Sequence, residues 1–264
     1  MGMSAKGSPG VSLGMWGLLH CWPRPVFGLE ADVSGGTWAL SHGLTWEPGL
    51  MDLASEQAPI TDSLLQRCSI PVAESKRVIC APKEPLSVQR GIEWAADRLG
   101  AWPESIDVLV DIGRTDATHP MIQRADAVVV WTRTTPQALG PTASLIAGLE
   151  HGIRPLVDVS IVTVGDRPYS GAETVEALTE FAGPRLRIRH GASLPFEPRL
   201  AEILETGGRK ASRLCNEWYG PLATNLAVSN AHRPLTLSSE PEPLPVSERQ
   251  GPTLLKALSQ RWAS

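Results

Sequence analysis

One segment near the start of this sequence has residue types and spacing that suit the binding of an anion. The segment Lys6-Gly7-Ser8-Pro9-Gly10-Val11-Ser12 lies directly before a stretch of helical periodicity. Glycines at the beginning of a helix allow backbone N–H groups to converge on an anion such as a phosphate. The segment therefore predicts a phosphate-binding loop. The alternative is an ordinary Gly/Pro turn before a helix.

Acidic residues follow two of the predicted strands. Glu30 and Asp32 end one strand and are followed by Gly35-Gly36, and Asp111 lies near the end of a later strand. Because the carboxyl ends of parallel strands meet at one edge of a sheet, we expect these carboxylates to face the anion-binding helix. That arrangement can hold a phosphate-bound Mg²⁺ ion. For Asp32 and Asp111, capping or solvation at a strand end is the alternative.

Short apolar runs alternate with longer segments of helical period along the chain. This pattern is typical of strands and crossover helices in a mostly parallel sheet, and it predicts an α/β fold with three α/β/α layers. The predicted strands are Val26–Ala31, Arg77–Ala81, Val108–Ile112, Ala127–Thr132, Val157–Val164 and Leu186–Arg189. The predicted helices are Val11–Cys21, Val88–Leu99, Pro136–His151, Ala172–Ala182 and Arg199–Glu205.

The composition changes near residue 228. Residues 1–227 are predicted to form one domain, in which only four residues precede the loop, so that the first strand is either short or begins upstream. Residues 228–250 are rich in Ser, Pro and Glu and predict a flexible linker. Residues 251–264 predict a short amphipathic segment, in which the leucines and Trp262 share one helical face.

The composition also argues against several classes of function. A net charge of −4 and a pI near 5.9 do not favour non-specific DNA binding. The four cysteines lie far apart without metal-ligand spacing, so reduced thiols are expected rather than zinc or a disulfide framework. The six histidines are scattered and receive no role. No signal peptide or long apolar run is present, which predicts a cytoplasmic protein.

The loop resembles the deviant Walker A motif of the MinD/ParA ATPase family, Lys-Gly-Gly-x-Gly-Lys-[Ser/Thr]. The likeness covers roughly the first 225 residues and is to MinD-like ATPases of the actinobacterial type. It continues through the segments ADAVVVWTRTTPQAL, VGDRPYSGAETVEAL and LPFEPRLAEIL. The resemblance implies a P-loop NTPase fold that binds ATP or ADP with Mg²⁺. It also implies a homodimer in which Lys6 reaches phosphates across the interface.

The resemblance assigns roles to individual residues. Glu30 stands where the family positions the attacking water, so Glu30 and Lys6 are the catalytic candidates. The Mg²⁺ candidates are Ser12, Asp32 and Asp111. The nucleotide-binding candidates are the phosphate-loop residues Lys6, Gly7, Ser8, Gly10, Val11 and Ser12 together with Arg167, Pro168 and Pro195, which stand where such folds wall the adenine.

Three departures from the family motif bear on catalysis. Val11 replaces the second lysine, Pro9 removes one backbone N–H, and Glu30 replaces an aspartate. Loss of a charge-assisted phosphate contact costs at least about 1.5–3 kcal/mol. The sequence thus predicts a positioning or partitioning factor with slow or no ATP hydrolysis. A non-enzymatic scaffold for a secretion, conjugation or localisation partner is the alternative.

The C-terminal segment resembles the membrane-targeting helix that closes many MinD proteins. It therefore raises the hypothesis of weak peripheral membrane contact through residues 253–262 at the inner face of the membrane. A short helix that docks on its own domain, or a disordered end, is the alternative. The resemblance does not identify the protein partner. A third hypothesis, a segregation protein that coats DNA, is disfavoured by the acidic net charge.

Overall fold

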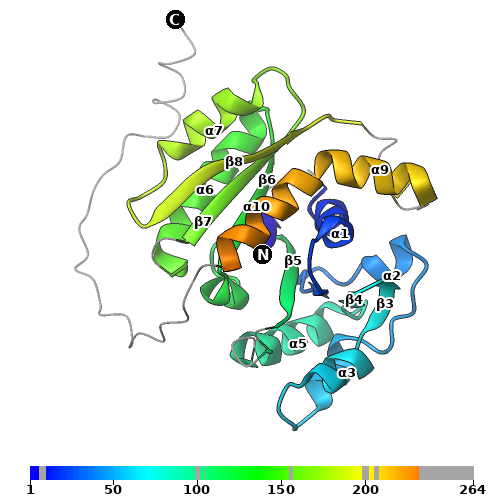
Figure 1. The fold of residues 1–264 in the computed structure, drawn as a ribbon. Helices are drawn as coiled ribbons and strands as arrows, with labels where there is room; N and C mark the ends of the chain where they lie inside the picture. Colours follow the sequence, from blue (N-terminus) through cyan, green and yellow to red (C-terminus); the bar gives the residue numbers. More distant parts are fainter. Residues whose placement is uncertain are drawn as a thin grey trace, which may run out of the picture. The chain divides into compact units, whose positions relative to one another are not determined.

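We describe a computed structural model of the chain, which defines residues 1–5, 10–98, 102–103, 105–154, 157–197, 202–204 and 208–231. Residues 1–231 form one compact unit, shown in Figure 1. Residues 232–264 lie outside the described residues. They include most of the predicted linker 228–250 and all of the C-terminal segment 251–264, with its predicted membrane-contact stretch 253–262. The predicted helix Arg199–Glu205 is described only at residues 202–204, which are helical.

Eight strands of the described residues form a single sheet in the order β3-β4-β2-β5-β1-β6-β7-β8. All neighbouring pairs are parallel except β3 and β4, which form an antiparallel hairpin at one edge. The strands are β1 Gly2–Ser4, β2 Val26–Glu30, β3 Ile70–Ala73, β4 Lys76–Ile79, β5 Asp107–Arg114, β6 Ala127–Arg133, β7 Val157–Val164 and β8 Leu186–Leu194. The predicted parallel sheet is therefore confirmed.

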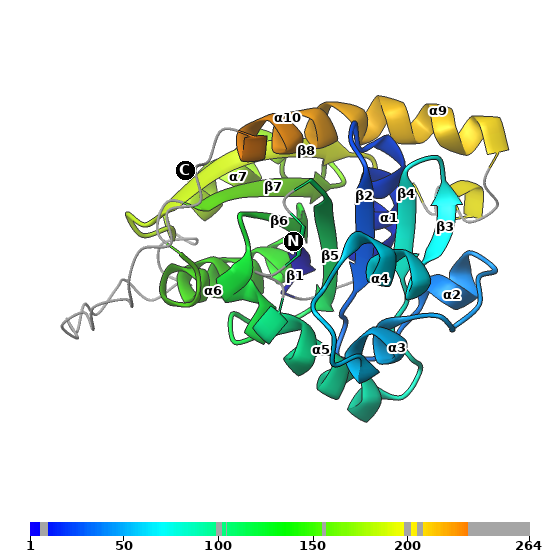
Figure 2. The same ribbon diagram turned by 60° about the horizontal axis from the view of Figure 1, so that its bottom comes forward.

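Helices cover both faces of this sheet, as Figure 2 shows, with α9 and α10 on one side and α5 on the other. On the first side, α1 contacts β1, β2 and β5 and is covered in turn by α9 and α10. The helices are α1 Val11–Cys21, α2 Trp38–Ser41, α3 Leu50–Ser55, α4 Asp62–Arg67, α5 Pro85–Arg98, the 3₁₀ helix η2 Pro120–Arg124, α6 Pro136–Gly152, α7 Gly171–Thr179, α9 Gly208–Trp218 and α10 Gly220–Ala231. The three-layer α/β/α fold is confirmed.

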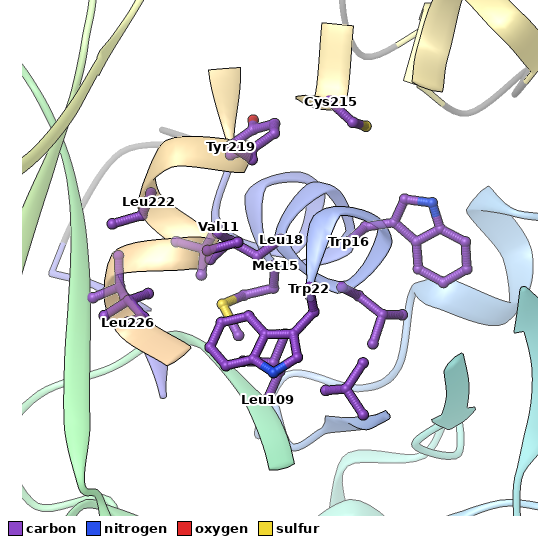
Figure 3. Packing of buried hydrophobic residues seen from close by; sticks show 14 of the residues in the cluster. Val11, Met15, Trp16, Leu18, Trp22, Leu109, Cys215, Tyr219, Leu222 and Leu226 are labelled. Carbon is purple, nitrogen blue, oxygen red and sulfur yellow. The ribbon is translucent and has the colours of Figure 1, made fainter. Parts of the chain in front are cut away.

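Helix α1 is buried between the sheet and the C-terminal helices. Its apolar residues Met15, Leu18 and Leu19 are almost fully buried, and Figure 3 shows Met15 and Leu18 beside Leu222 and Leu226 of α10. Two glycines allow the close packing. A Cβ on Gly14 would lie 2.6 Å from the Trp131 ring of β6, and a Cβ on Gly17 would lie 2.4 Å from the Tyr219 ring. The helix that follows the loop thus has a fixed position.

The central strand β1 is short. Gly2 pairs with Asp111 of β5 and with Val129 of β6, and the Met1 ammonium donates a hydrogen bond to the Ala127 carbonyl at 2.9 Å. Burial lowers the pKa of this amino group to about 6. The strand contributes three residues, and α1 therefore provides much of the apolar contact that holds this part of the sheet together.

Candidate functional site

The carboxyl ends of β1, β2 and β5 meet at one edge of the sheet, next to the beginning of α1. This edge carries the predicted site. Lys6, Gly7, Ser8 and Pro9 lie outside the described residues. Gly10 precedes the first turn of α1 with φ of +80°, in the left-handed region that favours glycine. The chain therefore enters α1 through a turn that a residue with a side chain would strain.

Asp111 is the most deeply buried acid of this edge, with 0% of its surface exposed. Its Oδ1 accepts a hydrogen bond from the Gly113 N–H at 2.9 Å. Its Oδ2 is buried and has no hydrogen-bond partner among the described residues. The Ser12 side chain lies near this carboxyl and favours its charged form. A buried carboxylate oxygen without a partner is a position that a cation can satisfy.

The electrostatics of Asp111 agree with that geometry. The pKa of Asp111 is raised from 3.8 to about 7, mainly by burial; the charges of Glu30 and Asp32 add to the rise, and Ser12 and Gly113 oppose it. Glu30 and Asp32 thus lie close enough to Asp111 to disfavour a negative charge on it. A divalent cation offsets such repulsion.

Asp32 lies in the loop that follows β2 and faces Gly113. A Cβ on Gly113 would lie 1.9 Å from Asp32 Oδ2, so the carboxylate lies directly over that glycine, which has φ of +61°. Its Oδ1 accepts the Ser34 N–H at 2.8 Å. The structure therefore brings Ser12, Asp32 and Asp111 to one edge. The described residues contain no cluster of three acidic, histidine or cysteine ligands, so phosphate and water oxygens are needed to complete a Mg²⁺ shell.

Glu30 is placed differently from the other two acids. It is 1% exposed and its side chain accepts three backbone N–H groups: Thr37 and Trp38 on Oε1, at 2.5 and 2.9 Å, and Ala81 on Oε2, at 3.1 Å. Burial raises its pKa, and these hydrogen bonds oppose the rise. Glu30 therefore ties the beginning of α2 and the segment just after β4 to the end of β2. Its catalytic assignment stays a prediction.

Val11, which replaces the family lysine, points into the protein. It is 6% exposed and belongs to the apolar cluster of α1, α9 and α10 shown in Figure 3. A lysine at this position would therefore have to leave the core to reach a phosphate. Val11 still contributes its backbone to the first turn of α1, as the predicted nucleotide-binding role requires.

The predicted adenine-binding residues come together at the ends of β6, β7 and β8. The Thr134 hydroxyl donates a hydrogen bond to the Arg167 carbonyl at 3.2 Å, next to Pro168. A Cβ on Gly165 would lie 3.4 Å from Thr134 Oγ1 and 3.8 Å from the Cβ of Phe196, the residue after Pro195. The two loops that the resemblance assigned are thus neighbours in space.

Two residues at this edge were missed by the sequence reasoning. Arg133 lies with its guanidinium 3.9 Å from the centre of the Phe196 ring, a cation–π contact at the mouth of the predicted adenine site. The polar residues at the end of strand β6, Arg133-Thr134, could have signalled it. His119 lies beneath Ala31, with Nε2 3.2 Å from the Ala31 carbonyl, and burial lowers its pKa. A single scattered histidine gave no signal in the sequence.

No protein-family model matches the sequence, and no curated protein matches it. Solved structures do match. The cell division ATPase MinD of Pyrococcus furiosus is 13% identical over 86% of this chain and 98% of that chain, with a TM-score of 0.63. A ParA family ATPase from Chlorobium tepidum TLS is 14% identical over 86% of this chain and 98% of that chain, with a TM-score of 0.64.

A third similar structure contains a bound nucleotide. It is the septum site-determining protein MinD of Pyrococcus horikoshii OT3 complexed with Mg-ADP, 14% identical over 85% of this chain and 94% of that chain, with a TM-score of 0.61. In the part of the chain that is described, no helix is long and apolar enough to cross a membrane. At these identities the likeness concerns architecture, and the chain therefore has the fold of the MinD/ParA ATPases.

Proposed function

We propose that this chain is a nucleotide-binding protein of MinD/ParA type, which binds ATP or ADP with Mg²⁺ and acts as a positioning or partitioning factor. The observation that carries the proposal is Asp111, a fully buried carboxylate whose Oδ2 has no partner among the described residues and which lies beside Ser12. The Mg-ADP complex of the similar P. horikoshii protein supports the choice of ligand.

In this proposal each residue has a defined task. Ser12, Asp32 and Asp111 hold the Mg²⁺ ion, and the ion neutralises phosphate charge when it is bound. Lys6 and the backbone N–H groups of Gly7, Ser8, Gly10, Val11 and Ser12 hold the phosphates. Arg167, Pro168 and Pro195 enclose the adenine, with Arg133 and Phe196 beside them. Glu30 is the candidate for orienting water, but its carboxylate accepts the N–H groups of Thr37, Trp38 and Ala81, which is one reason why hydrolysis is proposed to be slow.

The test is nucleotide binding by the full chain, measured by calorimetry and thermal shift with ATP, ADP and AMP, each with and without Mg²⁺. We expect stabilisation by ATP and ADP that depends on Mg²⁺, and little effect of AMP, because the phosphates and the ion supply most of the contacts. The absence of any Mg²⁺-dependent shift would refute the proposal.

Hydrolysis is proposed to be slow or absent. Val11 stands where the family has a phosphate-binding lysine, and its side chain lies in the core. Glu30 stands where the family positions the attacking water, and its carboxylate accepts backbone N–H groups instead. The same two observations favour the second candidate, a scaffold without ATPase activity that serves a secretion, conjugation or localisation partner.

The variant Val11→Lys distinguishes the two candidates. In a site that is otherwise complete, the new ammonium leaves the core, reaches the phosphates and raises ATP turnover. Val11→Met, which has similar length and no charge, is the matched control for lost packing. Turnover that stays at the background level in Val11→Lys, in a protein that remains folded, supports the scaffold.

Assembly is a separate part of the proposal. Dimerisation through Lys6 predicts an increase in molecular mass in ATP with Mg²⁺, measured by light scattering, and its loss in Lys6→Ala. Membrane contact through residues 253–262 predicts co-sedimentation with anionic vesicles that requires the dimer, because one short helix binds only marginally. Truncation after residue 250 should abolish it. DNA binding is not expected.

A further inference from the structure

Helices α1 and α9 approach each other closely along one stripe. Gly17 of α1 lies against the ring of Tyr219, which directly follows α9, so closely that a Cβ on Gly17 would be 2.4 Å from the ring. One helical turn further along α1 is Cys21, and one turn earlier on α9 is Cys215. Because four-residue steps keep to one face of a helix, the two cysteines lie on the facing stripes.

The thiols of these two cysteines lie close enough to influence each other's ionisation. Cys215 is 4% exposed and belongs to the apolar cluster, as Figure 3 shows, while Cys21 packs against the same cluster and is partly exposed. Cys21 is therefore the more exposed residue of the pair.

A cation lies next to the pair. Lys76 Nζ donates a hydrogen bond to the carbonyl of His20, the residue that precedes Cys21. The charges of Lys76 and of both cysteines influence one another. The interaction with Cys21, together with the nearby ammonium, lowers the pKa of Cys215 against the effect of burial, while the interaction with Cys215 and burial raise the pKa of Cys21. Cys215 is therefore the thiol of the pair that ionises more readily. Among the described residues, Cys68 and Cys80 have no such partner effect, and burial raises the pKa of both.

We propose that Cys21 and Cys215 form a reversible dithiol–disulfide site whose co-reactant is a low-molecular-weight disulfide such as oxidised glutathione. The more exposed Cys21 passes its proton to the Cys215 thiolate and attacks the small disulfide, which forms a mixed disulfide and releases one small thiolate. Cys215 then loses that proton to solvent, attacks Cys21 Sγ and releases the second small thiolate. The protein loses two electrons and two protons overall, and the small disulfide is reduced to two thiols.

The disulfide would join the helix that begins at the phosphate loop to the helix that covers it. It would fix α9 on α1 covalently, in the position that the Gly17–Tyr219 contact already defines. This proposal concerns α1 and α9 alone and does not depend on nucleotide binding.

The test uses the full chain equilibrated in buffers of varied ratio of oxidised to reduced glutathione, followed by acid quenching, alkylation and peptide mass mapping. We expect two of the four thiols to be lost together while the protein stays folded, and a peptide cross-linked between Cys21 and Cys215. The oxidised form should unfold at a temperature about 5–15 °C higher than the reduced form.

Variants separate this site from general oxidation. Cys215→Ser should stop at a glutathione adduct on Cys21, and Cys21→Ser should form no cross-link. Cys68→Ser is the matched control and should keep the cross-link. Lys76→Met should slow oxidation several-fold without changing the product, because it removes the cation that favours the thiolate.

Two results would overturn the proposal, and both are available from the unmodified chain even if a variant does not fold. One is the retention of all four thiols in the folded protein at every glutathione ratio. The other is a cross-link that involves Cys68 or Cys80, or that forms only after unfolding.

Discussion

Glu30 on β2 and Asp111 on β5 are register partners in a parallel strand pair, and both carboxylates are buried. Their environments differ sharply. Glu30 accepts three backbone N–H groups, whereas Asp111 accepts one from Gly113 and keeps Oδ2 without a partner among the described residues. The two neighbouring acids therefore differ in role. Glu30 holds backbone segments in place, whereas Asp111 has one carboxylate oxygen that can still accept a hydrogen bond or contact a cation.

Asp111→Asn should stabilise the protein without ligand at neutral pH. Because the pKa of Asp111 is raised from 3.8 to about 7, the folded state binds the proton more tightly than the unfolded state, and stability falls as pH rises between these values. The charge at neutral pH therefore costs up to roughly 4 kcal/mol, which the amide avoids. Urea unfolding between about pH 4 and pH 8 measures this difference, which should vanish at the acid end.

The same variant should lose the Mg²⁺-dependent stabilisation by ADP, because an amide offers a cation less charge. Asp97→Asn, at an exposed position of α5, is the control and should change neither property. A variant that is no more stable than the parent at neutral pH would argue against an unfavourable buried charge at Asp111.

Glu30→Gln should destabilise the chain and loosen α2. The amide keeps one acceptor oxygen, so at least one of the N–H groups of Thr37, Trp38 and Ala81 loses its partner in a buried place. An unsatisfied buried donor costs about 1–3 kcal/mol. Hydrogen exchange at these three amides should be faster than in the parent, and Glu74→Gln, on the exposed β3–β4 turn, should leave it unchanged. Unchanged exchange in Glu30→Gln contradicts the anchoring role.

His42 should contribute to acid sensitivity. Its ring stacks on Trp16 of α1 with 3.5 Å between centroids and 5° between planes, and burial, followed by the charge of His20, lowers its pKa to about 4. The unfolded chain thus takes up the proton first, and stability is lost as pH falls from about 6.5 to about 4. His42→Phe keeps a stacked ring that cannot titrate.

The difference between His42→Phe and the parent is the informative quantity, because Asp111 titrates over the same range with the opposite sign. We expect the variant to lose less stability than the parent on acidification in urea unfolding. His151→Gln, at an exposed position of α6, is the control. Parallel curves for parent and His42→Phe would rule out this contribution.

Gly17→Ala should weaken the packing of the C-terminal helices on α1. The added methyl would lie 2.4 Å from the Tyr219 ring, whereas the same change at Gly140 of α6 meets nothing within 4 Å. We expect a loss of about 1–3 kcal/mol for Gly17→Ala. Gly140→Ala should instead gain about 0.5–1 kcal/mol, because alanine favours the helix. Equal thermal midpoints for the two variants contradict the close approach.

The parallel core of the sheet was predictable from the sequence, because strands that are covered on both faces are nearly continuous apolar runs. Val157–Val164 agrees with β7 at both ends, and Val11–Cys21 agrees with α1. The hairpin strand β3 was missed, since Ile70–Ala73 is short and alternates between half-buried and exposed positions. Helices α9 and α10 were missed as well. Helix α9 has few apolar residues, and its place is set by contact with α1.

The site was predictable in part. The meeting of Ser12, Asp32 and Asp111 followed from the rule that parallel strands end at one edge. The engagement of Glu30 did not, because its partners Thr37 and Ala81 come from loops whose path no local pattern specifies. The burial of Val11 was equally hidden, since it depends on the helices α9 and α10, which lie at the far end of the described chain.

The two close glycine contacts of α1 have a mechanical consequence. Gly14 rests on Trp131 of the sheet and Gly17 rests on Tyr219, so the helix has no room to shift towards either neighbour. Substitutions that enlarge either glycine would therefore be expected to push α1 away from the sheet or from the C-terminal helices. The first turn of the same helix, after Gly10, forms one wall of the candidate site, so the packing of its middle bears on the geometry of its beginning.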